Sequence, residues 1–138
     1  MPVIRRAERG DLEAVAAIQS TSPEAAHWAV AEYMQYEFTV SIAGGSVAGF
    51  LVWRRLAEDE CEVLNLVVAP RFRRSGIARK LLEPLLHVPD NQVFLEVRES
   101  NQAARIFYKS MGFQEVSTRR EYYEFPSEAA IVMKFHSC

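Results

Sequence analysis

The sequence is poor in the residues from which disulfide frameworks and metal sites are built. It has 2 cysteines and 3 histidines in 138 residues. Cys61 lies in an apolar run and Cys138 is the last residue, which is not the spacing of a disulfide-stapled domain. His27, His87 and His136 are scattered and match no metal-ligand spacing. We therefore expect no disulfide framework, surface roles for the histidines and no metal cofactor.

Long apolar runs and an excess of positive charge are also missing. No run approaches the ~20 apolar residues that are needed to cross a bilayer, and the first residues lack the apolar core of a signal peptide. The formal net charge is -2, which excludes the global basic field of a nucleic-acid-binding protein. These absences predict a cytoplasmic protein with no membrane and no nucleic-acid partner.

The composition is that of a globular domain. Hydrophobic residues make up 49% of the chain and charged residues 25%, and a chain of this length buries a core without covalent staples. No internal repeat, low-complexity tract or long linker divides the sequence. We expect a single domain over residues 1–138.

Periodicity and turn residues predict an alternation of strands and helices. The expected strands cover 3–5, 38–43, 46–56, 61–68, 93–98, 114–123 and 129–135, and the expected helices cover 11–20, 23–35, 76–86 and 102–111. Gly44-Gly45 marks a hairpin, and Gly112 is a candidate helix cap. Pro84 removes a backbone donor inside the third helix, so we expect a kink or an early end there. The order predicts an α/β fold with a mixed sheet and helices on its faces.

The most informative stretch runs from residue 67 to residue 79, where a buried strand ends, a basic loop follows and a helix begins at Gly76. The start of a helix has unpaired N–H groups and partial positive charge, so it is a ready anion site. Gly76 lets a phosphate approach the backbone, and the arginines add charge-assisted contacts. The alternative is an ordinary strand–loop–helix turn with a solvated basic surface. Neither the nucleotide P-loop nor the three-glycine dinucleotide motif is present.

Together with the segment that follows, this loop resembles the GNAT superfamily of acetyl-CoA-dependent N-acetyltransferases. Arg73-x-x-Gly76-x-Ala78 matches the acetyl-CoA signature of that family. The next block is matched by Asn101, Ala103-Ala104, Phe107-Tyr108 and Gly112-Phe113. The chain is most similar to the RimI-type ribosomal-protein-alanine N-acetyltransferases, through Leu95-Glu96-Val97-Arg98 and Arg119-Arg120-x-Tyr122-Tyr123.

The resemblance implies a GNAT fold: a mixed, mostly antiparallel sheet of about seven strands, splayed between strands 4 and 5, with about four helices. It also implies acetyl-CoA as the acetyl donor. The backbone of Leu66, Val67 and Val68 would hold pantetheine and the acetyl group, and Asn101 would hydrogen-bond the pantetheine arm. The pyrophosphate would lie on residues 74–79. The cofactor-binding residues of this loop are Arg73, Arg74, Ser75, Gly76, Ile77, Ala78 and Arg79.

Two further residues match the family's proton-transfer groups. Glu96 matches the general base that takes a proton from the amine, directly or through a water. Its alternative is a surface glutamate on a strand. Tyr108 matches the general acid that protonates the departing thiolate. Its alternative is a helix tyrosine that packs on the sheet with its hydroxyl at the rim.

The acceptor side is carried by aromatic residues. Trp28 and Tyr33 lie where the branch has an acceptor-binding segment, and core packing explains them equally well. Tyr122 and Tyr123 lie where the branch lines its peptide entrance, with an edge-strand aromatic pair as the alternative. The chain departs from the branch near this site, because residues 123–126 replace a longer loop.

Three hypotheses from different classes follow. The first is an acyltransferase that acetylates a protein N-terminal α-amine, with a ribosomal protein as a candidate partner. The second is an acetyltransferase for a small amine. The third is a non-catalytic module that binds acetyl-CoA.

Overall fold

The structure is a computed structural model, and it describes residues 2–22, 29–124 and 127–137, without the side chains of 121–124 and 127. Contacts between Cα atoms divide the chain into two compact units. The first unit comprises Met1–Arg54 and Val63–Pro84, and the second comprises Arg55–Glu62 and Leu85–Cys138.

The described strands form one seven-stranded sheet in the order β1-β2-β3-β4-β5-β7-β6. The strands are β1 (Val3–Arg6), β2 (Glu37–Ala43), β3 (Ser46–Ala57), β4 (Glu60–Val68), β5 (Gln92–Arg98), β6 (Gln114–Glu124) and β7 (Ser127–His136). β4 pairs with β5 in parallel, from Glu60 opposite Gln92 to Glu62 opposite Phe94. The described β1–β2, β2–β3, β5–β7 and β6–β7 pairs are antiparallel. The predicted mixed sheet is confirmed.

The α-helices in the described residues are α1 (Leu12–Ser20), α2 (Ile77–Leu86) and α3 (Gln102–Ser110). Short 3₁₀ helices cover η1 (Arg9–Asp11), η2 (Val30–Gln35) and η3 (Pro70–Phe72). None of these helices combines the length and apolar character that crossing a membrane requires.

Two helix predictions need correction. The predicted helix over 23–35 is a 3₁₀ helix over its described part, η2, and residues 23–28 lie outside the described residues. α2 does not end early at Pro84 but continues to Leu86. Leu85 and Leu86 are 4% and 7% exposed, and burial of two leucines offsets the one hydrogen bond that the proline removes.

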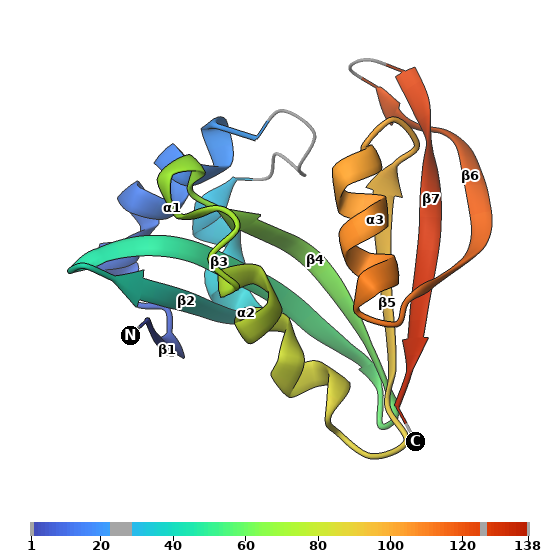
Figure 1. Ribbon diagram of the computed structural model, residues 1–138, viewed down its shortest axis with the longest axis horizontal. Helices are drawn as coiled ribbons and strands as arrows, with labels where there is room; N and C mark the ends of the chain where they lie inside the picture. The colour runs from blue at the N-terminus through green and yellow to red at the C-terminus, as the bar shows by residue number, and fades with distance from the viewer. Residues whose placement is uncertain (1, 23–28, 125–126, 138) are drawn as a thin grey trace. The chain divides into compact units, whose positions relative to one another are not determined.

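The first unit packs helices on both faces of its strands (Figure 1). Because side chains alternate along a strand, Phe50 and Val52 of β3 share one face, where they join the core cluster that includes Val15 of α1 and Tyr33 of η2. Gly49 belongs to the other face, where a Cβ would lie 3.3 Å from Cγ2 of Ile77, the first residue of α2. The start of α2 is therefore held directly against β3.

The second unit packs α3 on one face of β5 and β7 (Figure 1). Gly112 follows α3 with φ +101°, and a Cβ there would come within 2.9 Å of the Phe135 ring of β7. Oε2 of Glu115, on β6, accepts a hydrogen bond from Arg105 Nε at 2.8 Å, and Lys109 Nζ lies 3.3 Å from the same oxygen. The hydrogen bond from Arg105 holds the pKa of Glu115 at about 2. Ion pairs and one close glycine contact thus fix α3 over the sheet.

Candidate active site

The loop between β4 and α2 has the backbone conformation of an anion cradle. Arg74 and Gly76 both have positive φ values, 64° and 82°, and alternating left-handed residues turn successive N–H groups toward one point. The first bond of the helix runs from Lys80 N to Gly76 O, so the helix uses none of the amides of residues 77–79. A Cβ on Gly76 would meet no atom within 4 Å. The loop is therefore open beside Gly76.

The arginines of this loop differ in what they contact. Arg73 turns back to the strand, where Nε donates to the Val68 carbonyl at 3.2 Å and Nη2 donates to Ser22 Oγ at 3.0 Å. The Arg71 guanidinium lies 4.6 Å from the centre of the Phe72 ring. Arg74 and Arg79 are exposed. The sequence did not reveal that Arg73 ties the loop to the end of α1.

The edge of β4 that faces away from β3 carries the backbone groups expected to hold pantetheine. Ala69 N donates to Ala48 O of β3 at 2.8 Å, so alternation turns the amides of Leu66 and Val68 toward the opposite edge. Leu66 N donates to Asn65 Oδ1 at 3.1 Å, and the Val68 carbonyl is the acceptor for Arg73. The Leu66 amide and the Val68 carbonyl are thus hydrogen-bonded to side chains of the first unit.

Asn65 belongs to a buried polar network that links three elements. Its Nδ2 donates to Gln19 Oε1 at 3.2 Å and to the Tyr33 hydroxyl at 3.1 Å, and the Tyr33 hydroxyl donates to Gln19 Oε1. The Tyr33 ring is 0% exposed and packs against Phe38 and Phe50. This placement supports the core interpretation of Tyr33, and its acceptor role stays a prediction. One polar residue inside the apolar run of β4 was the sequence signal for the network.

Replacing Tyr33 with phenylalanine separates the two interpretations. We expect the free energy of unfolding to fall by about 1–2 kcal/mol, because Asn65 and Gln19 each lose a buried partner. The KM for the amine acceptor should not change. Chemical denaturation and steady-state kinetics measure both quantities. A raised acceptor KM with unchanged stability would instead place Tyr33 in the acceptor site.

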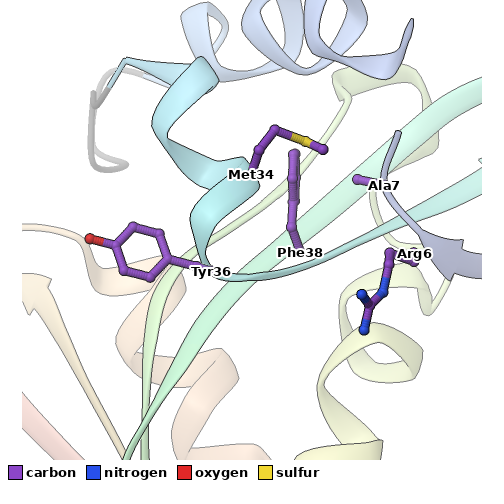
Figure 2. Close-up of a pocket in the computed structure, with 5 residues that line it drawn as sticks. All are labelled: Arg6, Ala7, Met34, Tyr36 and Phe38. Carbon is purple, nitrogen blue, oxygen red and sulfur yellow. The ribbon is translucent and has the colours of Figure 1, made fainter. Parts of the chain in front are cut away.

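A small hollow lies at the end of η2, lined by Arg6, Ala7, Met34, Tyr36 and Phe38. Figure 2 shows Met34 and Phe38 side by side, with the Tyr36 ring turned away from them. The hollow has a volume of about 90 Å³, well below the ~300–1,000 Å³ of ordinary ligand pockets. It is too small for a coenzyme or a peptide.

Glu96 lies in the middle of β5 with its carboxylate held from one side. Nη1 of Arg119, on β6, donates to Glu96 Oε1 at 2.6 Å. The other oxygen, Oε2, is buried and has no hydrogen-bond partner among the described residues. The side chain is 17% exposed. The side chain is thus partly buried on its strand, and the role of Glu96 as general base stays a prediction.

Tyr108 is on α3 and is 7% exposed. Its ring packs edge-on against the rings of Phe107 and Phe113, with centroid separations of 5.2 and 5.4 Å. Burial raises the pKa of the Tyr108 phenol well above its ordinary value. The phenol keeps its proton at physiological pH, and burial makes it a weaker acid than a solvent-exposed tyrosine.

Glu96 and Tyr108 lie on opposite faces of the second unit's sheet. Glu96 is opposite Val132 in the β5–β7 register, and residues at even positions of β7 share its face. Phe135, at an odd position, contacts Gly112 at the end of α3. Because α3 lies on the Phe135 face, its Tyr108 approaches the sheet from the side opposite Glu96.

Most of the chain is similar to a known protein family. The family described as the acetyltransferase (GNAT) family matches residues 5–113.

The chain belongs to the GNAT acetyltransferase family.

Similarity to individual GNAT proteins extends over the chain. It is 36% identical over 107 residues to the ribosomal protein bS18-alanine N-acetyltransferase of Escherichia coli strain K12, covering 73% of this chain and 70% of the relative. The crystal structure of Ard1 from Thermoplasma volcanium superimposes with a TM-score of 0.89 at 30% identity, covering 99% and 98% of the two chains. The structure of Naa20 from Chaetomium thermophilum, solved in complex with a bisubstrate analogue, superimposes with a TM-score of 0.85 at 27% identity. The match covers 98% of this chain and 86% of the Naa20 chain.

This GNAT chain is therefore an N-acetyltransferase, an enzyme that moves an acetyl group from acetyl-CoA to an amine. No group of three histidine, cysteine, aspartate or glutamate side chains within the described residues could hold a metal ion. The free thiol of Cys61 is buried, which raises its pKa, so it is a poor nucleophile.

The remaining predicted residues of the GNAT site are placed only in part. Asn101 caps α3, with Oδ1 accepting from Ala104 N at 3.1 Å. Trp28 lies outside the described residues. Tyr122 and Tyr123 belong to β6, and their side chains lie outside the described part of the chain.

Sequence reasoning missed the group that orders the loop before Asn101. Glu128 of β7 accepts from Ser100 N at 2.9 Å, from Ser100 Oγ at 3.0 Å and from Arg98 Nη1 at 3.2 Å. The hydrogen bond from the Ser100 amide and the further bonds lower the pKa of Glu128. No sequence pattern links a residue of β7 to a loop 28 positions earlier.

Proposed function

We propose that this protein transfers the acetyl group of acetyl-CoA to the α-amine at the N-terminus of a protein, with Glu96 as general base and Tyr108 as general acid. The observation that carries the mechanism is the contrast between the two residues. Glu96 is a carboxylate with one oxygen held by Arg119 and, among the described residues, one oxygen unpaired. Tyr108 is a buried neutral phenol. Glu96 carries an oxygen that can accept a proton, and Tyr108 carries an O–H group that can donate one.

The residues of the first unit fit the coenzyme. The amides at residues 77–79 would bind the pyrophosphate, and the exposed guanidinium groups of Arg74 and Arg79 would add charge. The edge of β4 at Leu66 and Val68 would bind the pantetheine arm as an added strand does, in exchange for Asn65 and Arg73. In the second unit, Asn101 uses its oxygen in capping α3, and its NH₂ group is the part of the side chain that would donate to a ligand.

Acetyl-CoA supplies an activated acetyl thioester when it is bound. The amine nitrogen forms a bond to the thioester carbon, and the carbon–sulfur bond breaks. Glu96 accepts the proton that the nitrogen must lose, directly or through one water. Tyr108 gives its phenolic proton to the departing sulfur, so the products are the acetylated amine and the free thiol.

The preference for a protein N-terminus is supported by the E. coli relative, whose name gives the alanine of ribosomal protein bS18 as its target. Tyr122 and Tyr123, which the resemblance assigns to the peptide entrance, belong to β6, the edge strand of the sheet. A ribosomal protein is therefore the first candidate partner.

The test is an acceptor panel with purified protein and acetyl-CoA, in which free thiol is measured. The panel holds a peptide that begins with alanine, the same peptide with a blocked N-terminus and an internal lysine, and a set of small amines and polyamines. We expect the free N-terminal peptide to have the highest kcat/KM by at least about tenfold. Higher rates with a small amine would make the protein a small-amine acetyltransferase. Coenzyme binding without thiol release from any acceptor would make it a non-catalytic module.

Replacing Tyr108 with phenylalanine tests the acid. The ring and its packing against Phe113 are kept, so the fold and coenzyme binding should be preserved. We expect kcat to fall by about 10- to 100-fold, because the thiolate then leaves without a proton donor. Phe107→Leu removes a neighbouring ring and is the control for packing alone. Full turnover in Tyr108→Phe would leave the tyrosine with its packing role only.

A further inference from the structure

The carboxylate of Glu96 is held asymmetrically. Oε1 accepts the short hydrogen bond from Arg119 Nη1, whereas Oε2 is buried without a partner among the described residues. A buried charged oxygen without a partner in a native protein calls for a specific explanation. Among the described residues, Arg119 therefore makes the one side-chain hydrogen bond that orients this carboxylate.

The contact depends on an arrangement across three strands. Glu96 is opposite Val132 on β7, and Arg119 of β6 is opposite Ala130 on the other side of β7. Val132 and Ala130 are two residues apart, so all four side chains share one face. The arginine must cross the whole width of β7, and the small side chain of Ala130 leaves room for it. Only two long side chains reach each other over this distance.

An irregularity in β6 begins directly after Arg119. The register with β7 shifts between Arg119 and Tyr123, so Arg119 is the last regularly paired residue before the bulge. Bulges re-aim the side chains beside them and are frequent next to active sites. The neighbouring Arg120 falls inside the irregular stretch and is exposed.

We propose that Arg119 is a positioning residue for the general base: it binds Oε1 of Glu96 and thereby fixes the orientation of the carboxylate that receives the proton of the attacking amine. This inference rests on the proposed role of Glu96. Arg119 itself is 53% exposed at its side chain, and exposed ion pairs contribute little to folding. Its effect should therefore appear in turnover and not in stability.

The experiment compares Arg119→Gln, Arg119→Lys and the matched control Arg120→Gln. We expect Arg119→Gln to lower kcat about 10- to 100-fold, the scale that misplacement of a reacting group produces. The KM for acetyl-CoA and the melting temperature should stay unchanged. Arg119→Lys keeps a donor of similar reach and should recover most of the loss. Arg120→Gln should have wild-type kinetics. Equal kinetics for Arg119→Gln and Arg120→Gln would refute the proposal.

A double-mutant cycle separates this proposal from the proposed function. If Arg119 acts through Glu96, adding Arg119→Gln to Glu96→Gln should lower kcat less than about twofold further, because coupled residues are not additive. Independent, multiplicative losses would mean that Arg119 acts elsewhere. Full activity in the single variant Glu96→Gln would refute the proposed role of Glu96 as general base. If the single variant Glu96→Gln is slow and the single variant Arg119→Gln is fully active, the general base stands and only the role of Arg119 is refuted.

Discussion

Replacing Glu96 with glutamine is expected to lower kcat by about 10²- to 10⁴-fold, the range that general base catalysis contributes. The amide has nearly the shape of the carboxylate but accepts no proton at neutral pH. Affinity for acetyl-CoA should not change, because Glu96 is not among the residues that are proposed to bind the coenzyme. Single-turnover kinetics and a coenzyme titration by calorimetry measure the two effects separately.

The control for this variant is Glu99→Gln. Glu99 follows β5 by one residue, and its side chain is exposed, so the charge removed is the same while the contact with Arg119 is kept. We expect wild-type turnover. If Glu96→Gln is as active as this control, the carboxylate is a strand residue without a chemical role, and another group or bulk water takes the proton.

Replacing Gly76 with alanine is expected to weaken acetyl-CoA binding by about 30- to 100-fold. The added methyl group would meet no protein atom within 4 Å, but it would project into the open cradle that the pyrophosphate needs. Loss of one hydrogen bond to a charged group removes about 2–3 kcal/mol, which corresponds to this change in affinity. Calorimetric titration of the free protein with acetyl-CoA measures it.

Gly44→Ala is a matched control for the same substitution. Gly44 has φ +59°, and an added Cβ there would also meet no atom within 4 Å, but this glycine lies in the β2–β3 hairpin. Both variants carry the strain of alanine in the left-handed region, about 1–2 kcal/mol, so both should lose similar stability. Only Gly76→Ala should lose coenzyme affinity. Equal affinities in the two variants would show that the pyrophosphate binds elsewhere.

The strands and the phosphate-binding loop could be predicted from the sequence because local rules fix them. Alternating apolar residues define the strands, Gly44-Gly45 closes the first hairpin with two positive φ values, and the change from a buried strand to Gly76 places the loop. The helix predicted over 76–86 is present as α2, and only the early end at Pro84 is absent. The burial of the two leucines after Pro84 is a tertiary effect that local rules do not include.

The partners of the candidate residues could not be predicted in this way. The contact between Arg119 and Glu96 spans 23 positions and depends on the register of β7 between two other strands. Arg73 belonged to the signature, but the sequence does not say that its guanidinium turns away from the loop to Ser22. From the sequence, Tyr33 was equally compatible with an acceptor site and a core, and the hydrogen bond from its hydroxyl to Gln19 supports the core interpretation.

The placement of Glu96 and Tyr108 on opposite faces of one sheet has a consequence for the catalytic cycle. After each turnover in the proposed mechanism, the carboxyl group keeps a proton that the phenol lacks. The β5 and β7 backbone between them is committed to ladder hydrogen bonds and offers no relay. Glu96 must therefore lose its proton to water on its own face, and Tyr108 must regain a proton from water on the other face. A slow exchange at either residue limits how soon the next acetyl group can move.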